Sequence, residues 1–212
     1  MVKESGKTIK RNASVIILAA GTSGRMQFPK LLLICDTGNT FIEKIINCYR
    51  QFEVEEIIVV INVDFKSQVS EQVWNKINQE TRIVLNDSLH KGRLHSLILG
   101  LRALKTQSFC FVQNVDNPSV NTRLLQVLYS KRSTDHYISP VHQNKGGHPV
   151  LLNHAIIEHL LNTDCSGWML NKILKNFEKI QVEVESPDIL TNINTRRDYQ
   201  LYIDQLKEKS LN

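Results

Sequence analysis

The chain has 212 residues, 42% of them hydrophobic and 22% charged, and a formal net charge of +5 at pH 7. This length and apolar content predict one globular domain over residues 13–212, preceded by a flexible polar tail over 1–12. The sequence contains no membrane-length apolar run, no secretory signal, and no long basic run interleaved with aromatic residues. We therefore expect a cytoplasmic protein that binds neither membranes nor nucleic acids, although the pattern makes no prediction of oligomeric state.

Apolar runs of strand length alternate with segments of helical periodicity along the chain. The strands are expected at residues 14–20, 56–61, 82–85, 109–115, 137–139, 149–152 and 180–184. The helices are expected at residues 40–50, 66–77, 93–104, 122–131, 153–161, 169–175 and 197–207. Thr40 is a plausible helix cap, because Glu43 follows at the spacing of a capping box.

This alternation predicts an α/β fold with three layers, α/β/α, of Rossmann-like type. The sheet should be mostly parallel and twisted, with about seven strands and with helices on both faces. Gly146–Gly147 lies between two short strands, where a hairpin or an irregular crossing would make the sheet mixed. Ligands of such sheets bind at the carboxyl ends of the strands, so the loops after Leu18, Val115 and Val184 should lie near one another.

The loop after the first strand is suited to binding a polyphosphate. It reads Leu18, Ala19, Ala20, Gly21, Thr22, Ser23, Gly24, Arg25, and it reaches Lys30 after a proline. Small side chains let the backbone approach a ligand, and loop N–H groups can point at phosphate oxygens. Arg25 and Lys30 add positive charge. The glycine spacing fits neither a Walker loop nor a Rossmann loop, and a plain surface turn with a solvated arginine and lysine is the alternative.

The segment 18–30 resembles the signature of the nucleotidyltransferases related to molybdenum-cofactor cytidylyl- and guanylyltransferases. That pattern is Leu-Ala-Ala/Gly-Gly-x-Ser-x-Arg-Met-Gly-x-Pro-Lys, and the chain departs from it only at Gln27. The resemblance implies a fold of the nucleotide-diphospho-sugar transferase type. It also implies Mg²⁺-dependent transfer of a nucleoside monophosphate from a nucleoside triphosphate, with CTP favoured, to a phosphorylated acceptor such as molybdopterin. Residues 18–24 would hold the nucleotide, and Arg25 and Lys30 would be catalytic.

Asp116 follows the apolar run 109–112 and precedes Asn117–Pro118. An aspartate in this position commonly forms a turn or caps a helix. The family has Asp-x-Pro here, and its aspartate binds Mg²⁺, so the resemblance assigns metal binding and catalysis to Asp116. The family's late Asp-Ile-Asp-Thr motif reads Asn192-Ile193-Asn194-Thr195, as in guanylyltransferases. Asn192 and Asn194 would then be uncharged metal ligands, or Asn194 and Thr195 would simply cap the last helix.

Two further segments match the family more loosely. The stretch 86–97 resembles the base-binding segment, which assigns nucleotide contacts to Asn86, Gly92, Arg93 and Ser96; the alternative is an ordinary loop and helix start. The run 146–151 resembles the Arg-Gly-His-Pro-Val-Leu segment beside the acceptor. Acceptor contacts are therefore expected from Gly147 and His148, and from Trp168, which could equally be a core residue.

Two other functions remain open at this point. Other members of the group activate sugar, polyol or choline phosphates, so a cytidylyltransferase for one of these is an alternative. The amides at positions 192 and 194 also leave open a non-catalytic nucleotide-binding module on the same fold.

Overall fold

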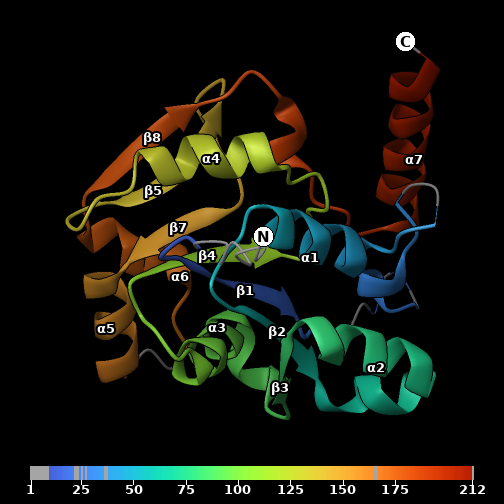
Figure 1. Cartoon of the computed structure of the whole chain (residues 1–212), viewed down its shortest axis with the longest axis horizontal. Coiled ribbons are helices and arrows are strands. Elements are labelled where there is room, and N and C mark those ends of the chain that lie inside the picture. Colours follow the sequence, from blue (N-terminus) through green and yellow to red (C-terminus); the bar gives the residue numbers. More distant parts are fainter. Residues whose placement is uncertain are drawn as a thin grey trace, which may run out of the picture.

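The computed structural model describes residues 10–21, 24, 26, 28–35, 38–164 and 167–211. A single eight-stranded sheet runs through the molecule, with strand order β3-β2-β1-β4-β7-β5-β6 and with β8 paired to β5 (Figure 1). The strands are β1 (Ser14–Ala19), β2 (Ile57–Asn62), β3 (Arg82–Asn86), β4 (Phe109–Asn114), β5 (Tyr137–His142), β6 (Lys145–Gly146), β7 (Val150–Asn153) and β8 (Lys179–Glu183).

Two orientations of strand meet within this sheet. Strands β1 to β4 pair in parallel, whereas β7 is antiparallel to both β4 and β5. The predicted fold class is confirmed, and the mixed sheet that Gly146–Gly147 left open is present. The short β6, which the sequence analysis did not expect, forms a hairpin with the end of β5.

Helices cover both faces of the sheet. The α-helices are α1 (Phe41–Gln51), α2 (Glu71–Glu80), α3 (Gly92–Ala103), α4 (Thr122–Ser130), α5 (His154–Asn162), α6 (Leu170–Ile173) and α7 (Arg196–Leu211). The 3-10 helices are η1 (Lys30–Leu32), η2 (Val63–Gln68), η3 (Leu89–Lys91), η4 (Leu174–Asn176) and η5 (Pro187–Leu190). Among the described residues, no helix is long and apolar enough to cross a membrane.

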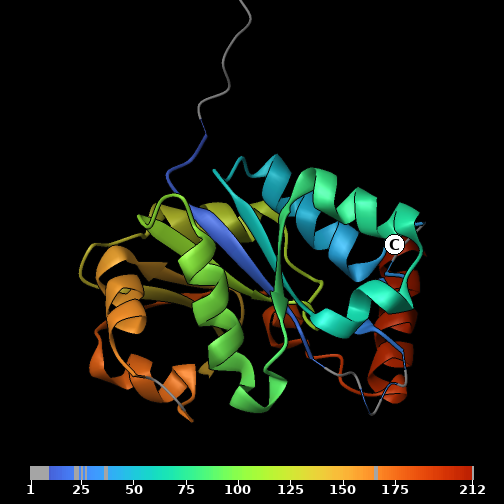
Figure 2. The same ribbon diagram turned by 90° about the horizontal axis from the view of Figure 1, so that it is seen from below.

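The core consists of two apolar clusters, one on each face of the sheet. Within β1, Val15 and Ile17 belong to the cluster under α1 and α4, whereas Ile16 and Leu18 belong to the cluster under α3 and α5. This alternation follows from the two-residue period of a strand. Figure 2 shows α3, in green, crossing its face of the sheet beside the orange α5.

Gly100 brings α3 close to the sheet. A Cβ atom at this position would lie 2.7 Å from Cγ2 of Ile16, so a larger residue would push the helix outward. The amino-terminal end of α3 carries Gly92 and Arg93, and the depth of the helix against β1 therefore sets the position of both residues.

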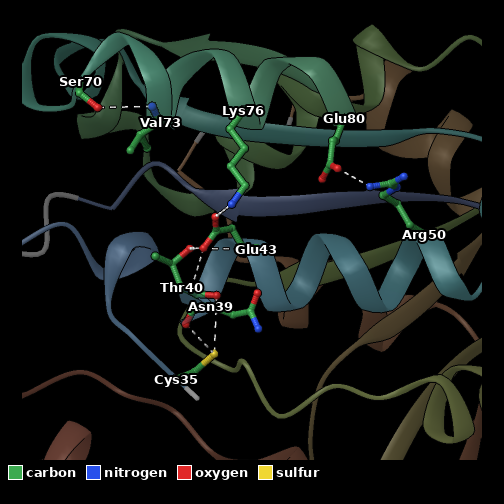
Figure 3. A network of polar contacts seen from close by, with 9 residues as sticks. All are labelled: Cys35, Asn39, Thr40, Glu43, Arg50, Ser70, Val73, Lys76 and Glu80. Atoms are coloured by element: carbon green, nitrogen blue, oxygen red, sulfur yellow. Dashed lines mark hydrogen bonds and ion pairs between the residues drawn. The ribbon is translucent and has the colours of Figure 1, made fainter. Parts of the chain in front are cut away.

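A capping box fixes the start of α1, as the sequence predicted. The Thr40 backbone N–H donates to Glu43 Oε2 over 2.8 Å, and the Glu43 N–H donates to the Thr40 hydroxyl oxygen. Figure 3 shows that Glu43 also pairs with Lys76 of α2, while Arg50 pairs with Glu80 at the other end of the two helices. These contacts anchor α1 directly after the segment that carries Lys30.

Two expectations about local structure were wrong. The helix expected over 66–77 is divided into η2 and α2, because the Ser70 hydroxyl caps α2 at Val73 (Figure 3). The second expectation is the boundary of the flexible tail, which was set at residue 12 and lies too late in the chain. Arg11 forms a β-bridge with Val54 and stacks on the Phe52 ring, so it belongs to the folded chain.

Candidate active site

A cavity of about 500 Å³ opens at the carboxyl ends of the parallel strands. This volume is within the range of small-molecule sites. Its lining residues are Leu18, Ala19, Ala20, Gly21, Gly24, Lys30, Leu31, Leu89, Gly92, Arg93, Ser96, Asn114, Val115, Asp116 and Asn194. The first loop, the start of α3, the loop after β4 and the segment before α7 therefore meet at one place.

Strand pairing explains why the first loop faces Asp116. Leu18 of β1 lies beside Asn114 of β4, and the Val115 N–H donates to the Leu18 carbonyl over 3.2 Å. Both strands end at this point, so Gly21, which follows β1, and Asp116, which follows β4, line the same cavity. A Cβ atom at Gly21 would meet nothing within 4 Å, which leaves the loop backbone open to a ligand.

Two cations converge on one oxygen of Asp116. Lys30 Nζ lies 4.0 Å from Asp116 Oδ2, and an Arg93 Nη atom lies 3.9 Å from it. Burial differs between the two: the Lys30 side chain is 15% exposed and that of Arg93 is 65% exposed. The other oxygen, Asp116 Oδ1, is buried and has no hydrogen-bond partner among the described residues. It is an available hard oxygen ligand.

The segment before α7 contacts both sides of this cluster. Lys30 Nζ donates to Asn194 Oδ1 over 2.8 Å, and the Ile193 N–H donates to the Asp116 carbonyl over 2.9 Å. Asn192 differs from Asn194, because its side chain is exposed, donates to the Leu190 carbonyl and is not in the cavity lining. Of the three expected metal ligands, the structure thus brings together Asp116 and Asn194.

On the side expected to bind the base, Gly92, Arg93 and Ser96 line the cavity. Gly92 has φ of +82°, a backbone conformation that favours glycine. Asn86 is fully buried, and it donates to the Ser96 hydroxyl over 2.8 Å while accepting from the Ser88 N–H. Asn86 therefore positions Ser96 and is not itself in the cavity lining. Arg93 reaches toward Asp116, although the sequence placed it with the base contacts.

On the side expected to bind the acceptor, His148 lies close to the same cluster. Its Nε2 is 2.9 Å from the Asn114 amide nitrogen, and its Nδ1 is buried without a hydrogen-bond partner among the described residues. Burial lowers the pKa of His148, while the negative charge of Asp116 acts in the opposite direction and Arg93 adds to the lowering. His148 is therefore expected to be neutral at pH 7.

Gly147 and Trp168 differ from His148 in what surrounds them. A Cβ atom at Gly147 would lie 2.5 Å from the Ile189 carbonyl oxygen, so glycine is needed for close packing on η5. Trp168 is 54% exposed and is not in the cavity lining; it is therefore not a core residue. Arg25, Thr22 and Ser23 lie outside the described residues, so their expected roles stay predictions.

A comparison with models of protein families identifies the family to which this chain belongs. The model of the MobA-like NTP transferase domain matches residues 15–180, which is most of the chain. The chain belongs to this family. It is accordingly a nucleotidyltransferase, and a sequence comparison with curated proteins finds no match.

Solved structures support the same fold for this NTP transferase. A nucleotidyl transferase from Methanothermobacter has a TM-score of 0.73 at 21% identity, over 93% of this chain and 99% of that one. Rv0371c from Mycobacterium tuberculosis, in complex with manganese, has a TM-score of 0.71 at 15% identity, over 92% and 100%. The methylerythritol-phosphate cytidylyltransferase of Thermus thermophilus has a TM-score of 0.67 at 15% identity, over 93% and 100%.

Sequence reasoning missed two asparagines in the site of this NTP transferase. Asn114 pairs with His148, and the buried Asn117 donates to the Ile189 carbonyl over 2.9 Å. The backbone N–H of His148 donates to the same carbonyl, so Ile189 connects the loop that carries Asp116 with the segment that carries His148. The sequence did contain a signal, because two polar residues, Gln113 and Asn114, end an otherwise apolar strand shortly before Asp116.

Proposed function

We propose that this nucleotidyltransferase transfers a nucleoside monophosphate from CTP, or from another nucleoside triphosphate, to the phosphate of a small acceptor. The observation that carries the proposal is the convergence of Lys30 and Arg93 on Asp116 within a cavity of about 500 Å³. Two cations beside a carboxylate suit a ligand that brings both phosphate groups and a divalent cation.

In the proposed reaction, an oxygen of the acceptor phosphate attacks the α-phosphorus of the triphosphate. A new P–O bond forms, and the bond from the α-phosphorus to the bridging oxygen breaks, so that pyrophosphate leaves with the electron pair. Catalysis then depends on positioning and on stabilisation of charge. Lys30 would hold the triphosphate and offset the charge that develops on pyrophosphate, with Arg25 assisting. The loop 18–24 would supply backbone N–H groups to the phosphates.

The residues at the cavity fit a divalent cation. Asp116 Oδ1 is a buried carboxylate oxygen without a partner among the described residues, and Asn194 adds an amide oxygen nearby. We propose that Asp116 and Asn194 hold Mg²⁺, which supplies charge neutralisation at the phosphates when it is bound. The manganese complex of the related mycobacterial protein is consistent with a divalent cation at this kind of site.

Base and acceptor would bind on opposite sides of Asp116. The Ser96 hydroxyl, held by Asn86, would contact the base or ribose. His148 would contact the acceptor, with the exposed Trp168 as a further candidate contact. Molybdopterin is our first candidate acceptor, and sugar, polyol or choline phosphates are the next. The Thermus neighbour is named as a cytidylyltransferase of methylerythritol phosphate, which makes CTP and a small phosphorylated acceptor reasonable first substrates.

A pyrophosphate-release assay tests the proposal. CTP, GTP, ATP and UTP are each supplied with Mg²⁺ and a panel of acceptor phosphates that includes molybdopterin. We expect release that requires both an acceptor and one preferred nucleotide, and that is lost in Asp116→Asn. Nucleotide binding without turnover on any acceptor would contradict the proposal and favour a binding module.

A further inference from the structure

A fully buried glutamine lies in the core three residues before Asp116. Gln113 is 0% exposed and is not in the cavity lining. Phe111, two residues earlier in β4, belongs to the apolar cluster under α1 and α4, so Gln113 points to the same face of the sheet. An amide in such surroundings destabilises the fold unless its polar atoms are hydrogen-bonded.

Both ends of the Gln113 amide have hydrogen-bond partners. Its Nε2 donates to the backbone carbonyls of Asn114 and Asn117, over 2.8 and 2.9 Å. Its Oε1 accepts from the Tyr49 hydroxyl of α1 over 3.1 Å. Burial raises the pKa of Tyr49 well above its ordinary value, so this hydroxyl keeps its proton and acts as the donor. Because two carbonyls accept at one end and a hydroxyl donates at the other, only one orientation of the amide satisfies all partners.

The two carbonyls that Gln113 holds lie on either side of Asp116 in the chain. The Asn117 N–H also donates to the Asn114 carbonyl over 3.2 Å, which closes a turn with Asp116 as its third residue. The carbonyl of Asp116 itself accepts from the Ile193 N–H over 2.9 Å. Gln113 therefore holds both ends of the turn from the core, while the segment before α7 holds its middle.

We infer that Gln113, oriented by Tyr49, is a positioning residue that fixes the Asp116 carboxylate for nucleotidyl transfer. Both side chains act through the backbone of the turn. A reacting group displaced by about 1 Å can lower a rate by about 10²-fold, whereas replacing both partners of a buried hydrogen bond by apolar groups of the same shape is nearly neutral for stability. This role rests on the proposed function and deepens it, because it explains how Asp116 is held in place.

Two substitutions in this network separate turnover from stability. Gln113→Met keeps the approximate length of the side chain but removes the amide, which leaves the buried Tyr49 hydroxyl without its acceptor. Adding Tyr49→Phe removes that hydroxyl, so the double variant should regain most of the stability that Gln113→Met loses. The turn at Asp116 stays unsupported from the core, and turnover should therefore stay low. If Gln113 only stabilised the fold, turnover would recover together with stability.

The experiment combines urea unfolding of the full chain with pyrophosphate release from CTP in the presence of Mg²⁺ and molybdopterin. Gln113→Met and the double variant should both lose about 10-fold to 10²-fold in turnover number. KM for CTP should stay within about threefold of the wild type, since the phosphate loop and Lys30 are unchanged. Tyr49→Phe alone keeps the aromatic ring in place and should lower turnover by about threefold, which provides a milder variant of the same network.

Asn153→Ser is the matched control. Asn153 is a buried amide that donates to the carbonyls of Thr134 and His136 over 2.8 and 3.2 Å. It pairs with Phe109 at the start of β4, the opposite end of the strand from Asp116. Serine can keep the cap of α5 while the amide is lost. This variant should lose stability and keep turnover within about twofold of the wild type, because it shares no partner with the turn.

Backbone hydrogen exchange, measured by NMR on the same proteins without nucleotide, tests the turn independently of turnover. The N–H groups of Asn117 and Ile193 should exchange at least about tenfold faster in the double variant than in the wild type, and unchanged in Asn153→Ser. Wild-type exchange at both groups in the double variant, or turnover that recovers there together with stability, would overturn the inference. Absence of turnover in the wild type would contradict the proposed function, and the exchange rates would then decide whether Gln113 holds the turn.

Discussion

The two halves of the sheet build the two sides of the site by different means. In the half formed by β1 to β4, the strands are parallel, and the cavity residues follow directly from strand ends, as Gly21 follows β1 and Asp116 follows β4. In the other half, strands of both directions meet, and His148 is held by contacts with Asn114 and with the distant Ile189 carbonyl. Local sequence thus determines the proposed nucleotide side, whereas packing between distant segments determines the proposed acceptor side.

This difference suggests that the two halves of the sheet have separate functions. We propose that the parallel half carries the groups that every nucleotidyl transfer needs, Lys30 and Asp116 among them. The mixed half carries the groups that we propose to select the acceptor. Substitutions in the first half should reduce turnover with every acceptor, and substitutions in the second should change acceptor affinity with little effect on the nucleotide.

The largest effect is expected from Lys30→Ala on the nucleotide side. Loss of a cation beside the leaving pyrophosphate should lower the turnover number by about 10²–10³-fold. The free energy of unfolding should fall much less than the activation barrier rises, by about 1 kcal/mol, the scale of a hydrogen bond such as the one that Lys30 donates to Asn194. Pyrophosphate release and urea unfolding measure the two quantities. Lys131→Ala, which changes an exposed lysine at the end of α4, is the control. Wild-type turnover in Lys30→Ala would show that the assignment of Lys30 is wrong.

A smaller and more selective effect is expected from His148→Gln on the acceptor side. Glutamine can keep a hydrogen bond to Asn114 while removing the imidazole, so KM for the acceptor should rise by about tenfold, the equivalent of about one hydrogen bond. The nucleotide Kd should stay within about twofold of the wild type. Steady-state kinetics and calorimetry separate the two. An equal loss of nucleotide affinity would contradict the division between the halves.

Tyr199→Phe should have a modest effect on the nucleotide side. The Tyr199 hydroxyl donates to the Ile34 carbonyl over 2.8 Å, and its ring packs edge-on against Phe41, so α7 supports the segment that carries Lys30. Removing the hydroxyl should raise KM for the nucleotide by about threefold and cost about 1 kcal/mol of stability. Tyr202→Phe is the matched control, because its hydroxyl accepts from Lys44 on α1. An equal change of KM in both variants would refute this role for Tyr199.

The smallest effect concerns pH. Burial lowers the pKa of His148 below its ordinary value, so at pH values below about 6.5 the unfolded chain binds a proton that the folded chain does not. This histidine therefore contributes stability that is present above about pH 6.5 and is progressively lost as the pH falls below that value. We expect a shallower loss of stability over this range in His148→Gln, measured by urea unfolding at a series of pH values. Parallel curves for the two proteins would contradict the assigned environment of His148.

Much of the parallel half could be predicted from the sequence. The β-branched run of β2 and the small residues after β1 are local signals, and the rule that ligands bind at the carboxyl ends of strands brought residues 21 and 116 together. Positions that depend on tertiary contacts were less predictable. The burial of Asn86 and the close packing at Gly147 depend on Ser96 and Ile189, which are separated from them in sequence. Asn192 is exposed to solvent, whereas Asn194 accepts a hydrogen bond from Lys30. The two asparagines belong to one short motif, and the sequence carried no sign of this difference.

The most direct test is a crystal structure of the protein with Mn²⁺ and a non-hydrolysable CTP analogue, in which anomalous scattering locates the metal. We expect a metal peak at Asp116, with the phosphate chain between Lys30 and Arg93 and the loop 18–24 around it. A triphosphate bound in another cavity, or a metal peak distant from Asp116, would contradict the proposed site.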